Sequence, residues 1–291
     1  MRIRSLRPRS MFGVIARGLL IGLMLGLLIL GSASHPAAAK AQAPAAKSQD
    51  GARASSPASL RVLSYNIHHG RGTDDQVDLE RIAQVIVDSR ADLVALQEVD
   101  QRTRRTGGVD QTQQLARLTG MHGQFCKQID YQGGEYGQAI LSRWPLSDLQ
   151  IHWLPGEPPR ERRIVATCAV AMPGHSLLFG STHWHHANAE IRLRQSQALS
   201  ELLSPLSAAV IIAGDLNAEP PAAPVQALAA QWGIVQSSQR LKTFPAVKPT
   251  KQIDYILYRP TSAMRIVSSE VIDEPLASDH RPLLAVLEFV E

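Results

Sequence analysis

Apolar positions along residues 60–291 fall into two patterns, one helical and one typical of strands. Helical spacing is clearest after Asp78, a suitable N-cap residue, because apolar side chains recur at positions 79, 82, 85 and 86. Similar patterns predict helices over residues 110–118 and 189–203. The first of these two ends before Gly120, a residue type that commonly terminates helices.

Short apolar runs predict strands, and the strands outnumber the helices. The runs cover residues 61–65, 92–96, 137–142, 163–171, 176–182, 209–213, 253–258, 264–272 and 283–289. Several follow one another without an intervening helix, whereas a doubly wound parallel sheet alternates strands with helices. We therefore expect an α/β protein in which two mixed β-sheets pack face to face with helices outside.

The first 39 residues differ in kind from the rest of the chain. Five arginines precede an uncharged, mostly apolar run over residues 18–30, and the small residues that follow this run suit signal-peptide cleavage. This run is shorter than the roughly 20 residues that span a bilayer. We predict a signal peptide over residues 1–39 and a protein that is exported, either periplasmic or secreted. An uncleaved N-terminal membrane anchor is the alternative, because residues 12–15 lengthen the apolar stretch if Arg17 extends its charge to the membrane surface.

The domain organisation follows from a change in composition after the apolar run. Residues 40–59 consist mainly of Ala, Ser, Gln, Pro and Lys with almost no large apolar side chain, which predicts a disordered linker. Residues 60–291 are long enough for one domain with an ample core. The sequence indicates no obligate protein partner, and we expect a monomer.

Charge is divided unevenly between these segments. The chain has 30 basic and 26 acidic residues, and five of the basic residues but no acidic ones fall within residues 1–39. The remainder therefore carries one more acidic than basic residue. A general affinity for nucleic acid cannot be inferred from this composition, because such affinity depends on an excess of Lys and Arg.

Polar side chains stand at or near the ends of several apolar runs. They occur in the segments Ser64-Tyr65-Asn66, Gln97-Glu98-Val99, Gly214-Asp215-Leu216-Asn217, Gln252-Ile253-Asp254-Tyr255 and Ser278-Asp279-His280. Because catalytic groups in α/β folds gather at strand ends, five such segments in one chain predict a single polar site built from many strands.

Two carboxylates among these residues suit a hard divalent cation. Glu98 follows an apolar strand directly, and Asp279 precedes another one. Mg²⁺ and Mn²⁺ prefer such oxygen ligands together with waters and substrate phosphate oxygens. Asn66 adds an amide that can serve as a ligand or can orient Glu98. We predict a Mg²⁺ site here, with Mn²⁺ as a possible substitute.

The remaining residues suit proton transfer and charge stabilisation. Asp215 and Asn217 lie on the same side of an extended segment, where the carboxylate can take a proton from water and the amide can donate to a phosphoryl oxygen. Asp254 and His280 are predicted to form a carboxylate–imidazole pair, in which the acid fixes the tautomer and orientation of the ring.

Histidines and arginines next to strands are further candidates. His183 is predicted to act as a general acid or phosphate contact, while the neighbouring His185 and His186 suit polar loop positions. A dinuclear zinc site is disfavoured, because the aspartate of the His-x-His-x-Asp-His zinc-binding pattern is replaced here by an alanine. The basic, glycine-containing loop after Glu98 suits contact with an anionic substrate group. Its arginines are Arg102, Arg104 and Arg105.

In their order along residues 60–291, these segments resemble the endonuclease/exonuclease/phosphatase superfamily, which includes deoxyribonuclease-I-like and neutral-sphingomyelinase-like enzymes. The resemblance implies a four-layered α/β sandwich, one or two Mg²⁺ ions and in-line hydrolysis of a phosphoester by water. It implies that Glu98 is the metal carboxylate, supported by Asn66 and Asp279, and that Asp215 orients or deprotonates the water. The other implied roles are a transition-state donor at Asn217, a phosphate-facing base at His280 paired with Asp254, and a catalytic histidine at His183.

The substrate is left open by the sequence. An exported metal-dependent phosphodiesterase is the leading expectation, and the substrate classes are nucleic acid, phospholipid and small phosphodiester. A secreted endonuclease acting on DNA or RNA is one alternative, and a phospholipid or sphingolipid phosphodiesterase or a phosphomonoesterase is another. A binding module on an inactive scaffold is disfavoured, because no residue of the set is missing.

Overall fold

The apolar runs assemble into two mixed six-stranded sheets in the structure, a computed structural model that describes residues 59–158, 161–203, 205–237 and 240–290. The first sheet has the strand order β11-β12-β1-β2-β4-β3. Its strands are β1 (Leu60–Asn66), β2 (Leu93–Gln101), β3 (His122–Tyr131), β4 (Gly134–Ser142), β11 (Met264–Val271) and β12 (Leu283–Phe289).

The second sheet has the order β5-β6-β7-β8-β10-β9. Its strands are β5 (Leu146–Trp153), β6 (Ile164–Met172), β7 (His175–His183), β8 (Ala209–Asp215), β9 (Gly233–Ile234) and β10 (Asp254–Arg259). The expected strands are all present, but the apolar pattern missed β3, β5 and β9. Each of these is an outermost strand of its sheet, and β3 and β5 expose many of their side chains, so they lack a continuous apolar face.

Four α-helices flank the sheets. They are α1 (Leu79–Ser89), α2 (Gln111–Thr119), α3 (Ala189–Leu203) and α4 (Ala223–Ala229). Asp78 and Asp110 cap α1 and α2 by accepting hydrogen bonds from backbone N–H groups three residues later. Asn188 caps α3 in the same way, through the N–H groups of Glu190 and Ile191. Single 3₁₀ turns, η1 (His68–Gly70) and η2 (Arg104–Thr106), follow β1 and β2.

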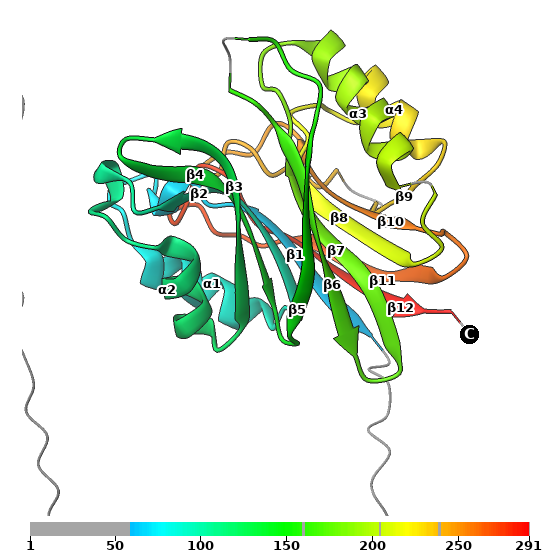
Figure 1. Ribbon diagram of the computed structural model, residues 1–291, viewed down its shortest axis with the longest axis horizontal. Helices are drawn as coiled ribbons and strands as arrows, with labels where there is room; N and C mark the ends of the chain where they lie inside the picture. The colour runs from blue at the N-terminus through cyan, green and yellow to red at the C-terminus, as the bar shows by residue number, and fades with distance from the viewer. Residues whose placement is uncertain (1–58, 159–160, 204, 238–239, 291) are drawn as a thin grey trace, which may run out of the picture. The chain divides into compact units, whose positions relative to one another are not determined.

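Three apolar cores hold these elements in four layers. One core lies between the two sheets and includes Val62 from β1 and Ile211 from β8. A second joins the outer face of the first sheet to α1 and α2, and a third joins the outer face of the second sheet to α3 and α4. Figure 1 shows the two helix pairs on opposite sides, with the sheets between them. The expected four-layered α/β sandwich is confirmed.

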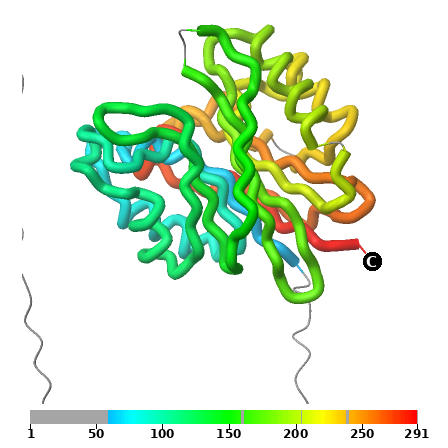
Figure 2. The backbone as a smooth tube through the Cα atoms, in the orientation of Figure 1, coloured from blue at the N-terminus to red at the C-terminus, as the bar shows by residue number. Residues whose placement is uncertain are grey.

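The strand directions bring the candidate residues to one edge. β1 runs parallel to β2, and β7 runs parallel to β8, so four strands end on that side. β10 and β12 run antiparallel to β8 and β1, so these two strands begin there. The tube in Figure 2 shows the blue β1 beside the red β12, although they come from opposite ends of the described chain. Chain ends that are distant in sequence therefore contribute to one site.

The predicted signal peptide and most of the predicted linker fall within residues 1–58, which lie outside the described residues. None of the helices among the described residues is long and apolar enough to cross a membrane. The sequence allows Cys126 and Cys168 either to pair or to remain buried thiols, and in the structure both are buried and free.

Candidate functional site

Asn66 links the two sheets at the edge where the candidate residues meet. Its Nδ2 atom donates to Glu98 Oε1 at 3.1 Å and lies 3.3 Å from Asp215 Oδ2 on the other sheet. Its Oδ1 atom accepts a hydrogen bond from the backbone N–H of His68 at 3.1 Å. This arrangement matches the orienting role considered for Asn66, because its Nδ2 atom donates to Glu98.

Glu98 owes its direction to an irregularity in β2. The register between β2 and β4 shifts between Gln97 and Val99, which is a β-bulge, and Glu98 has a φ of +58°. A bulge turns one side chain away from the regular alternation of the strand. Beneath it, the buried Gln97 side chain donates to Ser181 Oγ of β7 at 3.1 Å and so ties the two sheets together. Glu98 is thus held on a rigid element at the rim of the site.

Asp254 and His280 are in contact, as the sequence predicted. His280 Nδ1 lies 2.9 Å from Asp254 Oδ2, and both side chains are buried. The hydroxyl of Thr243 donates to the same carboxylate oxygen. Burial lowers the pKa of His280, but the adjacent Asp254 carboxylate outweighs it and raises that pKa to about 10. His280 is therefore an imidazolium ion at neutral pH.

Asp215 sits at the centre of the buried part of the site. Its Oδ2 atom lies 3.5 Å from His183 Nε2 and 3.7 Å from His280 Nε2, and its Oδ1 atom accepts the Asn217 backbone N–H at 2.8 Å. Burial, reinforced by the charge of Asp254, raises the pKa of Asp215 to about 7, while His280 acts in the opposite direction. We call Asp215, Asp254 and His280 the relay cluster.

His183 and Asn217 adjoin the relay cluster from β7 and from the turn after β8. Burial, with the nearby Arg163 guanidinium, holds the pKa of His183 well below its usual range, so the ring is neutral. Asn217 has a φ of +49°, and its side-chain amide donates to the Trp184 carbonyl at 3.1 Å. The structure thus places both predicted residues within the site. His185 lies outside it, where its Nδ1 atom accepts backbone N–H groups of the following loop.

Two histidines that the sequence analysis did not single out stand beside Glu98. Donor atoms of His68, His69 and Glu98 lie within 4.8 Å of one another, and we call these three residues the donor cluster. Asp279, the other predicted carboxylate, lies 3.8 Å from His68 Nδ1 and is 42% exposed. The signal for these histidines was their position, two imidazoles between the end of the first strand and Gly70.

The predicted arginine loop divides into two kinds of residue. Arg105 is bound to the buried Asp100 through Nε at 2.7 Å and Nη2 at 2.8 Å. Its guanidinium also lies over the rings of Tyr131 and Tyr136. Arg102 and Arg104 are exposed instead. Of the three, Arg105 is therefore the one whose charge is already compensated by a buried partner.

A cleft of about 150 Å³ lies between Arg105 and Glu161. Burial raises the pKa of Glu161, although Arg163 opposes the shift, and the carboxylate also accepts a hydrogen bond from Gln128. The charge of Glu98 adds to this upward shift. The cleft thus combines charged side chains with the aromatic rings of Tyr131 and Tyr136.

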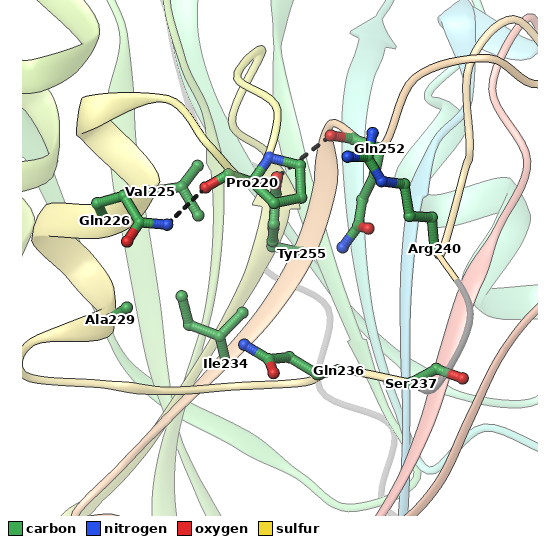
Figure 3. A pocket seen from close by; sticks show the side chains of 10 residues that line it. All are labelled: Pro220, Val225, Gln226, Ala229, Ile234, Gln236, Ser237, Arg240, Gln252 and Tyr255. Atoms are coloured by element: carbon green, nitrogen blue, oxygen red, sulfur yellow. Dashed lines mark hydrogen bonds between the residues drawn. The ribbon is translucent and has the colours of Figure 1, made fainter.

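A second cleft, of about 280 Å³, opens beside α4 and is drawn in Figure 3. In it, Gln226 donates to the Pro220 carbonyl at 2.7 Å, and the Tyr255 hydroxyl contacts the Gln252 carbonyl at 3.2 Å. Tyr255 belongs to the core between the second sheet and α3 and α4, so it faces away from its neighbour Asp254. This cleft therefore lies on the other face of β10 from the relay cluster.

The donor cluster fits a divalent cation better than the relay cluster does. In the relay cluster, the His280 ring is already bound to Asp254, and all three residues are buried. In the donor cluster, Glu98 supplies a partly exposed carboxylate, and the buried His69 Nδ1 has no hydrogen-bond partner among the described residues. Imidazole nitrogens gathered with a partly exposed carboxylate are an arrangement that a metal ion can complete.

The chain is similar to known proteins of one family. A model of the endonuclease/exonuclease/phosphatase family matches residues 63–280. A structure described as an endonuclease/exonuclease/phosphatase from Beutenbergia cavernae is 25% identical, with a TM-score of 0.64, over 80% of this chain and 72% of that one. Two structures show the fold alone. One is a mannosyl-6-phosphatase from Bacteroides thetaiotaomicron, which is 20% identical over 80% of this chain and 100% of that one, with a TM-score of 0.64. The other is the human nocturnin catalytic domain with bound sulfate, which is 21% identical over 80% of this chain and 95% of that one, with a TM-score of 0.62.

Proposed function

The chain belongs to the endonuclease/exonuclease/phosphatase family, whose members are metal-dependent hydrolases of phosphoesters, and from this premise we propose that it is an exported phosphodiesterase. The cation expected from the carboxylates is Mg²⁺ or Mn²⁺. The observation that carries the proposal is the position of Asn66. It contacts Glu98 on one side and Asp215 on the other, and so joins a candidate cation site to a buried acid–base site.

The relay cluster has protonation states suited to hydrolysis by water. Asp215, with a pKa raised to about 7, can accept a proton from water near neutral pH. His280 is cationic, because Asp254 holds its proton, and it can donate to a phosphoryl oxygen or to the leaving oxygen. As the water oxygen bonds to phosphorus and the bond to the leaving oxygen breaks, Asp215 gains the proton that the water loses. A bound divalent cation adds neutralisation of charge on the phosphoryl oxygens.

The balance of charge in the site supports a diester over a monoester. Glu98, Asp254 and Asp279 are carboxylates, whereas His280 is the imidazolium ion among them. A diester brings one negative charge and a monoester brings close to two at neutral pH. The diester therefore meets less repulsion from the carboxylates. Nucleic acid is the second candidate substrate, favoured by the exposed Arg102 and Arg104 on the loop after β2.

A substrate panel tests this function. Full-length protein is assayed with bis(nitrophenyl) phosphate, nitrophenyl phosphate, plasmid DNA, RNA, sphingomyelin and phosphoinositides, with Mg²⁺, with Mn²⁺ and with chelator. We expect metal-dependent cleavage, with the diester turned over faster than the monoester. The Asp215→Asn variant is the inactive control. Faster cleavage of the monoester, or equal rates in chelator, contradicts the proposal.

Export is proposed from the N-terminal composition and is tested separately. Five arginines, a short apolar run and small residues around position 39 support cleavage of a signal peptide. N-terminal sequencing of the protein recovered from periplasm or medium should find a start near Lys40 or Pro44. Intact Met1 in the soluble cytoplasmic fraction contradicts export, while intact Met1 in membranes indicates an uncleaved anchor.

We also propose that the protein is a monomer, and sedimentation analysis measures its oligomeric state.

A further inference from the structure

The backbone of the donor cluster is unusual in all three of its residues. His68 and His69 have φ values of +45° and +47°, and Glu98 has +58°. Residues other than glycine rarely adopt this left-handed conformation, and such strain persists only where the surrounding structure enforces it. Three left-handed residues with their side-chain donors within 4.8 Å of one another form a built arrangement.

The turn that carries the histidines is fixed by hydrogen bonds on both sides. Gln111 of α2 donates to the His69 carbonyl at 2.7 Å, and the Asp78 N–H donates to the Gly70 carbonyl at 2.8 Å. Asn66 holds the His68 N–H at 3.1 Å. These bonds involve the backbone of the turn, so they set the direction of the rings without occupying the ring nitrogens.

The His69 ring has one buried nitrogen without a partner among the described residues. The residue is 7% exposed, and its Nδ1 atom makes no hydrogen bond within the described residues. Its ring packs edge to face against the ring of His68 at 4.5 Å between centroids. A buried imidazole nitrogen is costly unless it is paired, and His69 also offers a ring nitrogen within 4.8 Å of donor atoms of His68 and Glu98, so a cation is the partner that this cluster suits.

We propose that His68 and His69 supply imidazole nitrogens to the cation held by Glu98. The site then prefers cations that accept nitrogen ligands, such as Mn²⁺ and Co²⁺, over Mg²⁺. Mg²⁺ is a hard ion that takes oxygen ligands, whereas imidazole suits first-row transition metals. The proposal rests on the proposed function only for the presence of a cation and makes no use of the substrate.

Pulsed electron paramagnetic resonance on the full chain with one equivalent of Mn²⁺ tests ligation directly. We expect echo modulation from directly bound ¹⁴N, which changes to the ¹⁵N pattern when the histidines carry ¹⁵N. His68→Gln with His69→Gln should lose this modulation. His122→Gln, at an exposed position on β3, is the matched control and should keep it. Wild-type protein that binds Mn²⁺ without nitrogen modulation overturns the proposal, and so does modulation that persists in the double variant.

Titration calorimetry tests the preference without any turnover. In the double variant, Mn²⁺ and Co²⁺ affinity should fall on the order of tenfold or more, while Mg²⁺ affinity changes little. Equal losses for all three ions, or no loss, contradict the proposal. If the double variant does not fold, by circular dichroism, the ¹⁵N-histidine measurement on the wild type decides. Because binding is measured alone, failure of the substrate assignment leaves this result unaffected.

Discussion

The relay cluster and the donor cluster lie on either side of Asn66, but they differ in how their side chains are held. In the relay cluster, the buried His280 ring is hydrogen-bonded to Asp254 Oδ2, and Thr243 donates to the same oxygen, although Asp254 Oδ1 has no partner among the described residues. In the donor cluster, the backbone is left-handed and the His69 Nδ1 atom has no partner. The first is therefore organised for proton transfer before any ligand arrives, whereas the second needs a ligand to complete it.

Removing the charge of Glu98 tests the dependence of the donor cluster on a cation and should have the largest effect. Glu98→Gln keeps the shape of the side chain but removes its charge. We expect kcat/KM for the preferred phosphodiester to fall on the order of 10³-fold with Mg²⁺, because charge on the phosphoryl group is then poorly neutralised. The variant should melt at the wild-type temperature. Glu201→Gln, on the exposed face of α3, should be fully active. A Glu98→Gln enzyme with wild-type turnover would show that the cation is held elsewhere.

Double substitution tests whether the relay cluster acts as one unit. Asp254→Asn and His280→Ala should each lower the rate on the order of 10²-fold, because Asp254 holds the His280 ring and its proton. The double variant should be little worse than the poorer single one, since residues that act together give non-additive losses. The comparison uses kcat at saturating metal. Multiplicative losses would mean that the two residues act independently.

Much of the relay cluster was accessible from the sequence. Asp215 ends the apolar strand β8, and Asp254 begins the apolar strand β10, so each stands at a boundary that hydrophobicity marks. His280 comes shortly before β12, which the apolar pattern predicted correctly. Strand direction then brings all three to one edge, and the two mixed sheets follow from strands that do not alternate with helices.

The donor cluster was less accessible, because its geometry depends on irregular backbone. Neither the bulge that redirects Glu98 nor the left-handed turn at His68 and His69 leaves a periodic signal in the sequence. The outermost strands β3 and β5 were missed for a related reason, since exposure removes their apolar pattern. Thr243 escaped notice as well, because its contact with Asp254 joins a loop to a strand across the fold.

Alkaline pH should lower the free energy of unfolding of the metal-free protein, because His280 of the relay cluster loses its proton. The pKa of His280 is raised to about 10, so its stabilising contribution is complete below about 6.5 and is lost as the pH rises through 10. Chemical denaturation in chelator should show the free energy of unfolding falling by roughly 2 to 4 kcal/mol from pH 7 to pH 10. His280→Asn should flatten this fall, and His122→Asn should not. Parallel curves for the wild type and His280→Asn would contradict the ion pair.

The smallest expected effect concerns the hydroxyl that Thr243 directs to Asp254, whereas His69 Nδ1 has no such partner among the described residues. Thr243→Val keeps the volume but removes this donor, so Asp254 retains His280 as its partner while losing one of its two hydrogen bonds at Oδ2. The loss of one such bond is worth about 1 kcal/mol, or about fivefold in rate. Thr243→Ser should restore most of the activity, because it returns the hydroxyl. Equal rates for the serine and valine variants would show that the hydroxyl does not orient Asp254, and the orientation of this carboxylate would then depend on His280.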